Sequence, residues 1–429
     1  MNRWTIFCIA ILACSTAFAE PHGPVRVELS GGPGHWQLLR DGKPYFIQGG
    51  GGKGSQKALA AAGGNSIRTW APDNLDVQLD EAQSLGLTVT IGIWLGHPRH
   101  GFNYTNAKQV EDQLDMARAA ILKYKDHPAV LMWGLGNEME SVGSEDNAAL
   151  WSAINNVASM AHKLDPNHPT MTVVAGIGGK KVLHIHKLCP DIDIIGVNQY
   201  GGIESLPKQY KETGGTKPYI VTEFGPPGVW ESGKNSFGAV PELTSTQKAK
   251  CYANAWRTAI APQKGICLGG YAFVWGQKQE TTATWFGTFL LDGARLGAVD
   301  ALTEIWTGRP PVNRCPVIER LKLDGEDDVD AAAVVQASLQ ASDPEGDPLT
   351  FRWVLQAETS KINFVGDVEM TPKIFEGTIV KFDGKHAEVK MPKDAGSYRL
   401  FAYVYDDHGG AAVANVPIHV KRAVSSPKR

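Results

Sequence analysis

Two glutamates close apolar stretches of the chain and could together break a glycosidic bond. Glu138 follows a run that ends in Gly136-Asn137, and Glu223 closes a run that begins at Tyr219. Glycosidic cleavage needs two carboxyl groups, one to protonate the leaving oxygen and one to attack or stabilise the oxocarbenium-like carbon. Either glutamate alone would be an ordinary ion pair or helix cap. The two together predict an acid/base and a nucleophile.

Other polar side chains stand at the ends of comparable runs. Arg68 lies in the run Ser66–Trp70, and a fixed cation beside Glu223 would hold that carboxylate ionised. Tyr200 follows the run Asp193–Gln199, and its phenol could hydrogen-bond the same carboxylate. We therefore expect both side chains at the catalytic site.

Aromatic and histidine side chains in the connecting loops could bind a sugar. The chain has 12 Trp, a high count that core residues mostly explain, although pyranose faces also stack on indole rings. We expect four sugar-binding tryptophans: Trp94, Trp230, Trp275 and Trp285. His97 and His100 either bind substrate or are ordinary polar loop residues. Their spacing is not that of a zinc-binding helix, so we expect neither a metal nor another cofactor.

These residues sit in a regular alternation of apolar runs and amphipathic helices. The eight runs are Tyr45–Gly49, Ser66–Trp70, Thr88–Leu95, Val130–Asn137, Thr170–Ala175, Asp193–Gln199, Tyr219–Glu223 and Gly269–Gly276. Two intervening segments carry the helical period, one from Val110 to Tyr124 and one from Leu150 to Leu164. Eight β-α units of this total length predict a (β/α)8 barrel over residues 20–309, with an open doubly wound sheet as the alternative. Side chains that end barrel strands meet at one face.

After Pro310-Pro311 the helical period disappears. Short strand-like runs follow between turn clusters such as Asp343-Pro344-Glu345-Gly346. We predict a small all-β, Ig-like sandwich over residues 312–421 and a flexible tail at 422–429. The proline boundary suggests that this domain is separable from the barrel.

The remaining features concern the compartment and the partners. Residues 1–19 combine Arg3, an apolar stretch and Ala17-Phe18-Ala19, which predicts a cleaved signal peptide and a secreted or periplasmic protein. No later run is long enough to span a membrane, and a formal net charge of −3 does not favour nucleic acid. Four cysteines follow this segment, Cys189, Cys251, Cys267 and Cys315, and they are either two disulfides or free thiols. The oligomeric state stays open.

The motifs resemble those of clan A glycoside hydrolases. The fragments Trp133-Gly134-Leu135-Gly136-Asn137-Glu138 and Thr222-Glu223-Phe224-Gly225 most resemble the barrel of family 2 enzymes and the family 5-like β-glucanases, over residues 36–308. The resemblance implies a retaining mechanism with Glu138 as acid/base and Glu223 as nucleophile. It also implies that Asn137 binds the sugar 2-hydroxyl, and that Arg68, Tyr200 and Trp275 support the two glutamates.

We therefore expect a secreted retaining hydrolase of a β-linked glucan or related polysaccharide, working through a covalent glycosyl-Glu223 intermediate. A glucan transglycosylase with the same residues is one alternative. A catalytically silent carbohydrate-binding protein is another, and a third makes the C-terminal domain an adhesion module with the barrel as passenger.

Overall fold

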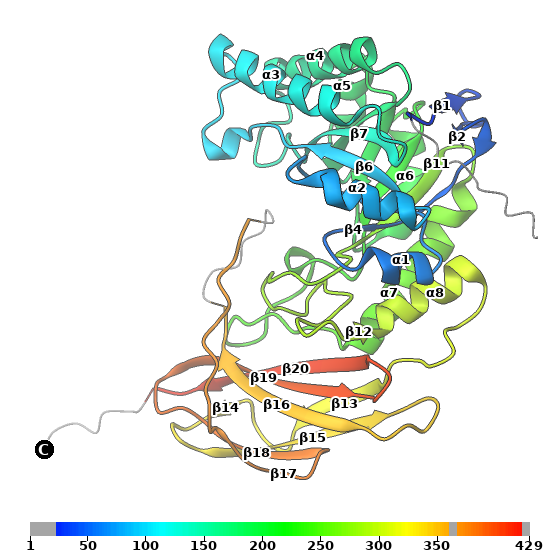
Figure 1. Ribbon diagram of the computed structural model, residues 1–429. Coiled ribbons are helices and arrows are strands. Elements are labelled where there is room, and N and C mark those ends of the chain that lie inside the picture. Colours follow the sequence, from blue (N-terminus) through cyan, green and yellow to red (C-terminus); the bar gives the residue numbers. More distant parts are fainter. Residues whose placement is uncertain (1–22, 360–366, 423–429) are drawn as a thin grey trace, which may run out of the picture.

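The computed structural model describes residues 23–359 and 367–422 (Figure 1). The predicted signal peptide and residues 423–429 of the predicted tail lie outside these ranges. Eight parallel strands form a closed barrel, in the order β10-β11-β4-β5-β6-β7-β8-β9. They are β4 (Ile47–Gly51), β5 (Ser66–Arg68), β6 (Thr88–Ile93), β7 (Val130–Asn137), β8 (Thr170–Ala175), β9 (Ile194–Asn198), β10 (Tyr219–Phe224) and β11 (Cys267–Phe273). The predicted (β/α)8 barrel is confirmed.

Helices cover the outside of the barrel. They are α1 (Gln56–Ala61), α2 (Leu75–Ser84), α3 (Ala107–Tyr124), α4 (Ala148–Leu164), α5 (Lys181–Leu188), α6 (Leu206–Glu212), α7 (Ser245–Ala255) and α8 (Gly297–Thr307). The side chains of Asn106 and Asn147 cap α3 and α4 by accepting bonds from the first free N–H groups. The stripe expected in α4 is buried, including Leu150, Ile154 and Val157. These helices therefore fix where each strand ends.

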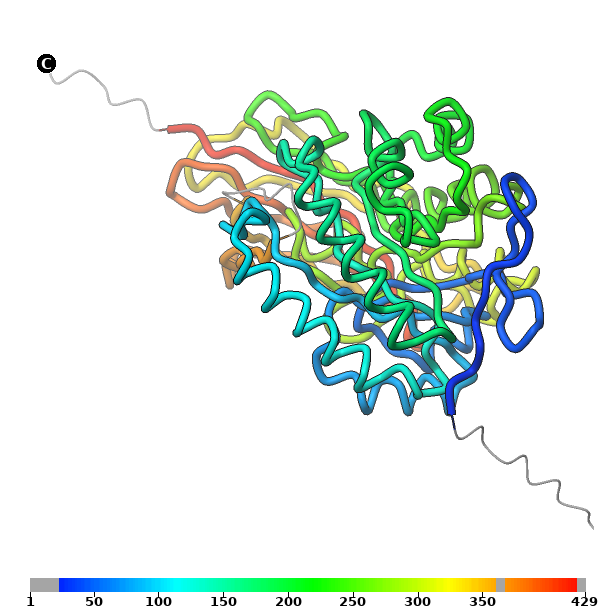
Figure 2. Tube along the Cα trace, turned by 90° about the horizontal axis from the view of Figure 1, so that it is seen from above, coloured from blue at the N-terminus to red at the C-terminus, as the bar shows by residue number. Residues whose placement is uncertain are grey.

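A small antiparallel sheet precedes the barrel and was not predicted. It consists of β1 (Val27–Ser30), β2 (Gln37–Arg40) and β3 (Lys43–Pro44). Val27 and Leu38 pack against side chains from the first residues of the barrel strands, among them Ile47 and Met171. The sheet thereby closes the N-terminal end of the barrel and leaves the opposite end for a site. Figures 1 and 2 show it on the far side of the molecule from the C-terminal domain.

The C-terminal part is all-β, as predicted, and consists of two sheets. One sheet holds β12 (Arg295–Leu296), β14 (Asp328–Val329), β16 (Thr350–Ala357), β19 (Gly396–Tyr405) and β20 (Gly410–Val420). The other holds β13 (Val317–Leu323), β15 (Val334–Ser342), β17 (Ile379–Phe382) and β18 (His386–Lys390). Trp353 is buried with Leu400 in their common core. Within the described ranges, Cys189, Cys251, Cys267 and Cys315 are all free thiols.

The two domains share secondary structure. Strand β12 comes from the chain between β11 and α8, yet it pairs in parallel with β20 of the all-β domain. Leu290 and Leu296 of the same segment are buried against Phe401 and Val413. A cut near Gly308 would expose these apolar side chains, so the structure argues against the expected separability.

A buried polar network also crosses this boundary. Arg399 of β19 is 1% exposed and binds Glu358 with an Nη2–Oε2 distance of 2.9 Å. It also donates to Asn415 Oδ1 at 2.7 Å and to the Val240 carbonyl of the barrel at 2.9 Å. Asn415 in turn donates to Glu242 Oε2 at 2.6 Å. Each of these groups needs its partner, because an unpaired buried charge is costly.

Replacing Arg399 by leucine is expected to lower the free energy of unfolding by about 3–5 kcal/mol, because Glu358 loses its buried counter-charge. Urea denaturation of the full chain measures the change. The exposed pair Arg314–Glu345 supplies the control, and Arg314→Leu should change stability little. Equal effects of the two substitutions would show that the network does not hold the domains together.

Candidate active site

Both glutamates lie at the C-terminal end of the barrel. Glu138 directly follows β7 and is half-buried, while Glu223 is the penultimate residue of β10 and is 6% exposed. Glu138 has a φ of 52°, in the left-handed region, and its N–H donates to the Val173 carbonyl at 2.8 Å. A non-glycine residue adopts this backbone only where its surroundings impose it, and such positions cluster at functional sites.

Three donors hold the Glu223 carboxylate. Arg68 Nη1 and Trp70 Nε1 bind its Oε1 at 2.9 and 3.2 Å. The Tyr200 hydroxyl donates to Oε2 at 2.6 Å. The Arg68 guanidinium is itself buried and also donates to the Thr222 carbonyl at 2.9 Å, so its place is fixed. The arrangement stabilises a negative charge on Glu223 and fixes the orientation of its carboxylate.

Glu138 has the opposite environment. Its Oε1 accepts one hydrogen bond, from Asn198 Nδ2 at 2.8 Å, and Thr222 Oγ1 fixes that amide by donating to Asn198 Oδ1 at 2.8 Å. Burial, followed by the negative charge of Glu223, raises the pKa of Glu138 to about 7. Glu138 therefore keeps its proton to a higher pH than an ordinary glutamic acid, while three donors face the carboxylate of Glu223, which is the division of roles that an acid and a nucleophile need.

Asn137 connects the two halves of the site. Its Oδ1 accepts from Arg68 Nη2 at 2.6 Å and from Asn198 Nδ2 at 3.2 Å. With Oδ1 held by two donors, the amide nitrogen is turned away from both of them. This orientation suits a donor to a sugar hydroxyl.

The remaining expected residues divide between the rim and the interior. Trp230 is 44% exposed, and its ring centroid lies 5.7 Å from that of Tyr200 in a T-shaped contact, so it borders the site. Trp94 is 37% exposed and lies 4.9 Å from the ring of His97. Burial and the neighbouring Arg99 lower the pKa of His97 to about 4, so this buried ring is neutral. His100 instead pairs with Asp367 of the all-β domain at 3.3 Å.

For the two other tryptophans, the structure corrects the predicted role in sugar binding. Trp275 is 1% exposed, and its Nε1 donates to the Ser55 carbonyl at 3.0 Å, away from Glu223. Trp285 is 3% exposed, and its Nε1 donates to the Pro227 carbonyl at 3.0 Å inside a buried loop cluster. Neither presents a ring face to a sugar, because both rings are used to pack the loops around the barrel end.

Three side chains of the site were not singled out from the sequence. Trp70 and Asn198 bind the catalytic carboxyl groups, and Phe273 at the end of β11 lies 5.8 Å from Trp70 and 5.9 Å from Tyr200, ring to ring. Trp70 closes the predicted run Ser66–Trp70 and Asn198 is the penultimate residue of Asp193–Gln199, so the strand-end pattern contained their signal, whereas Phe273 lies three residues before the predicted end at Gly276. Phe273, rather than Trp275, is therefore the aromatic residue of this strand that packs beside the side chains holding Glu223.

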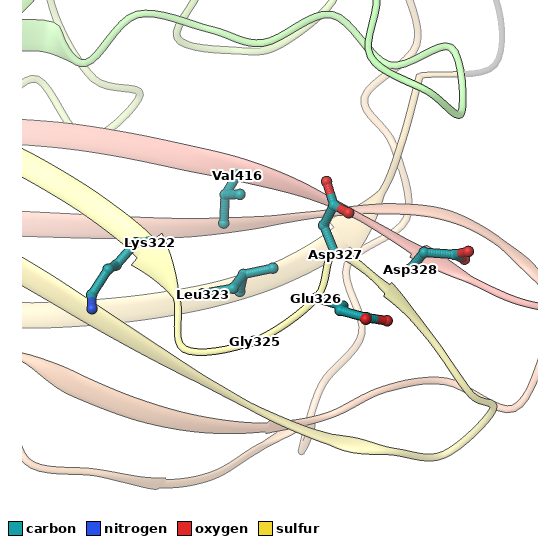
Figure 3. A pocket seen from close by; sticks show the side chains of 7 residues that line it. All are labelled: Lys322, Leu323, Gly325, Glu326, Asp327, Asp328 and Val416. Carbon is teal, nitrogen blue, oxygen red and sulfur yellow. The ribbon is translucent and has the colours of Figure 1, made fainter.

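A hollow of about 440 Å³ lies apart from these residues, on the all-β domain (Figure 3). It is lined by Lys322, Leu323, Gly325, Glu326, Asp327, Asp328 and Val416. The carboxylates of Glu326 and Asp327 point in different directions, and none of the seven is aromatic. We therefore place substrate binding at the barrel. Among the described residues, no helix is both long and apolar enough to cross a membrane.

Comparison with known proteins supports a glycoside hydrolase. Residues 77–258 match the family model described as glycosyl hydrolases family 2, TIM barrel domain. A β-glucuronidase of Paenibacillus borealis is 29% identical over 148 residues, which cover 29% of this chain and 23% of that relative. The match includes only a minor part of the relative's length.

Solved structures show the same fold. A β-D-glucuronidase of Dictyoglomus thermophilum gives a TM-score of 0.52 at 22% identity, over 67% of this chain and 54% of that one. β-Glucuronidase 2 of Bacteroides uniformis, solved covalently bound to cyclophellitol-6-carboxylate aziridine, gives 0.51 at 16% identity, over 92% and 48%. The chain thus corresponds to about half the length of these proteins.

Proposed function

We propose that the chain is a retaining β-glycosidase of clan A, with Glu138 as acid/base and Glu223 as nucleophile. The observation that carries the proposal is the contrast between the two carboxyl groups. Three donors surround the Glu223 carboxylate, whereas Glu138 accepts one hydrogen bond, from the Asn198 amide, and has a pKa raised to about 7. The family 2 match over 77–258 supports the same chemistry.

The reaction takes two steps. In the first, a Glu223 oxygen attacks the anomeric carbon as the bond to the leaving oxygen breaks, and Glu138 gives its proton to that oxygen. In the second, the Glu138 carboxylate takes a proton from water, whose oxygen displaces Glu223 from the anomeric carbon. Two inversions restore the original configuration. Asn137, fixed by Arg68 and Asn198, donates to the sugar hydroxyl next to the reacting carbon.

We propose a β-linked glucan or related polysaccharide as substrate. The exposed Trp230 beside Tyr200 suits the face of a further sugar unit, as an extended substrate requires. The predicted signal peptide would deliver the enzyme to the compartment where such polymers are met. The relatives are named β-glucuronidases, so aryl β-glucuronides are included among the compounds to be tested.

Transfer to a second sugar is the other candidate function. An acceptor stacked on Trp230 would compete with water for the glycosyl-Glu223 intermediate, because its hydroxyl is held in attack geometry. Products longer than the starting oligosaccharide at high concentration would demonstrate transfer.

One experiment tests both functions. The full chain is incubated with β-1,3- and β-1,4-glucan oligomers and with aryl β-glucosides and β-glucuronides. Proton NMR follows the first minutes, and mass spectrometry follows product length. Retention predicts the β anomer first, with the α anomer appearing only by mutarotation. Initial release of the α anomer would overturn the mechanism.

A further inference from the structure

The loop that follows β11 brings an ion pair to the edge of the catalytic site. Lys278 Nζ lies 2.7 Å from Glu280 Oε2 and 5.5 Å from the ring centroid of Phe273. The Phe273 ring lies 5.9 Å from that of Tyr200, whose hydroxyl binds Glu223. One aromatic ring therefore separates the Lys278–Glu280 pair from the side chains that hold the nucleophile. The mechanism above does not use this pair.

The pair is accessible at one end and buried at the other. The Lys278 side chain is 29% exposed, and the Glu280 side chain is 5% exposed. Burial raises the pKa of Glu280, Lys278 opposes the shift, and the charge of Glu223 adds to it. A ligand can reach the ammonium group of Lys278, but the charge of that ammonium is already neutralised by the Glu280 carboxylate. Arg68 is matched to Glu223 in the same way.

The all-β domain fixes the loop that carries the pair. Thr281 has a φ of 61°, a costly backbone for a β-branched residue. Its N–H donates to Glu369 Oε2 at 2.6 Å, and its carbonyl accepts from Thr359 Oγ1 at 2.5 Å. Thr282 Oγ1 donates at 2.7 Å to Glu242, which belongs to the buried network at the domain boundary. The loop is thus held in place before any substrate binds.

This geometry suits a neutral sugar. Neighbouring pyranose hydroxyls both donate and accept, so they can bind a carboxylate and an ammonium at once. The carboxylate of a hexuronic acid only accepts, and it would lie close to Glu280 and Glu223, whose described counter-cations Lys278 and Arg68 are each already paired with a carboxylate.

We propose that the Lys278–Glu280 pair is a specificity element that binds hydroxyls of a neutral sugar next to Glu223 and disfavours hexuronic acids. The proposal rests on the proposed glycosidase function and adds the residues that would select a neutral sugar over an anionic one. It predicts that the chain differs in substrate charge from the β-glucuronidases to which it is similar.

The test compares p-nitrophenyl β-D-glucoside with p-nitrophenyl β-D-glucuronide. We expect wild-type kcat/KM to favour the glucoside. Glu280→Gln should lower this preference by about 10-fold, because one repelling charge is removed. Lys278→Met should raise the preference for the glucoside, because the Glu280 and Glu223 carboxylates remain while the Lys278 ammonium is gone. A general loss of structure cannot shift the glucoside preference in opposite directions in the two variants. The control is Glu304→Gln on the exposed face of α8, which should leave the preference unchanged.

Binding provides a second measurement that does not need turnover. The affinity of each sugar for the Glu223→Gln variant is measured by titration calorimetry, with and without the Glu280→Gln change. The same tenfold shift is expected. A wild-type preference for the glucuronide, or preferences that Glu280→Gln and Lys278→Met leave unchanged, would overturn the inference but not the retaining mechanism. An inactive wild type that still prefers the neutral sugar in binding would overturn the proposed function and support the inference.

Discussion

Replacing Glu223 by alanine is expected to lower kcat on any glycoside substrate by about 10⁴-fold or more, because the covalent intermediate cannot form. The fold should survive. Arg68, Trp70 and Tyr200 would lose their common acceptor, although Arg68 keeps its bonds to the Thr222 carbonyl and to Asn137 Oδ1. Steady-state kinetics and a thermal melt of the same preparation separate loss of chemistry from loss of fold.

Azide rescue identifies the role rather than the importance of this residue. A small anion can occupy the space left by the Glu223 carboxylate and attack the anomeric carbon once. The expected product from a β-glycoside is therefore an α-glycosyl azide, seen by NMR. The surface variant Glu304→Ala should match wild type. A β-glycosyl azide from Glu223→Ala would assign the residue as the acid/base instead and reverse the two roles.

The strand pattern was sufficient to locate these carboxyl groups. Each predicted barrel run overlaps an observed strand, because buried parallel strands are continuous apolar runs and the helices between them carry a distinct period. Polar residues that end such runs must meet at one face of a closed barrel. Glu138, Glu223, Arg68 and Tyr200 could therefore be placed together without knowing a single contact.

Trp275 shows where the pattern stops. If β11 had continued to Gly276, the two-residue period would have put Trp275 on the same face as Phe273. The strand instead ends at Phe273, and the Val274 N–H bonds the Phe286 carbonyl of the next loop. Gly50 of β4 leaves room for the Trp275 side chain, since a Cβ at that position would come within 2.7 Å of it. Strand ends are decided by such tertiary contacts.

The contacts between the two domains also could not be predicted from the local sequence pattern. The proline pair and the change of period mark where the all-β chain begins. They carry no information about β12, a two-residue strand that the barrel donates to the other sheet. Nor do they indicate that Glu242, Asn415 and Arg399 form one buried network. Pairings of residues more than a hundred positions apart leave no periodic trace in the sequence.

The pH dependence of activity should report Glu138. Its pKa of about 7 means that kcat/KM falls as the pH rises through this value, because the acid loses the proton that the leaving oxygen needs. In Glu138→Gln the amide is too weak an acid to protonate the leaving oxygen. We expect the basic limb to disappear, and kcat/KM on a natural oligosaccharide to fall by about 10²–10⁴-fold.

The leaving group then distinguishes an acid from a merely structural residue. A 2,4-dinitrophenolate departs without protonation, so the first step on a dinitrophenyl glycoside should be nearly as fast in Glu138→Gln as in wild type. The second step still lacks a base, so glycosyl-Glu223 should accumulate. A burst of dinitrophenolate and intact-protein mass spectrometry would both detect it. Asn198→Ala is the matched variant, because it removes the hydrogen bond that the Asn198 amide donates to Glu138. This variant should keep the basic limb of the pH profile and move its midpoint to higher pH. Equal losses on dinitrophenyl and natural substrates in Glu138→Gln would show that Glu138 is not the proton donor.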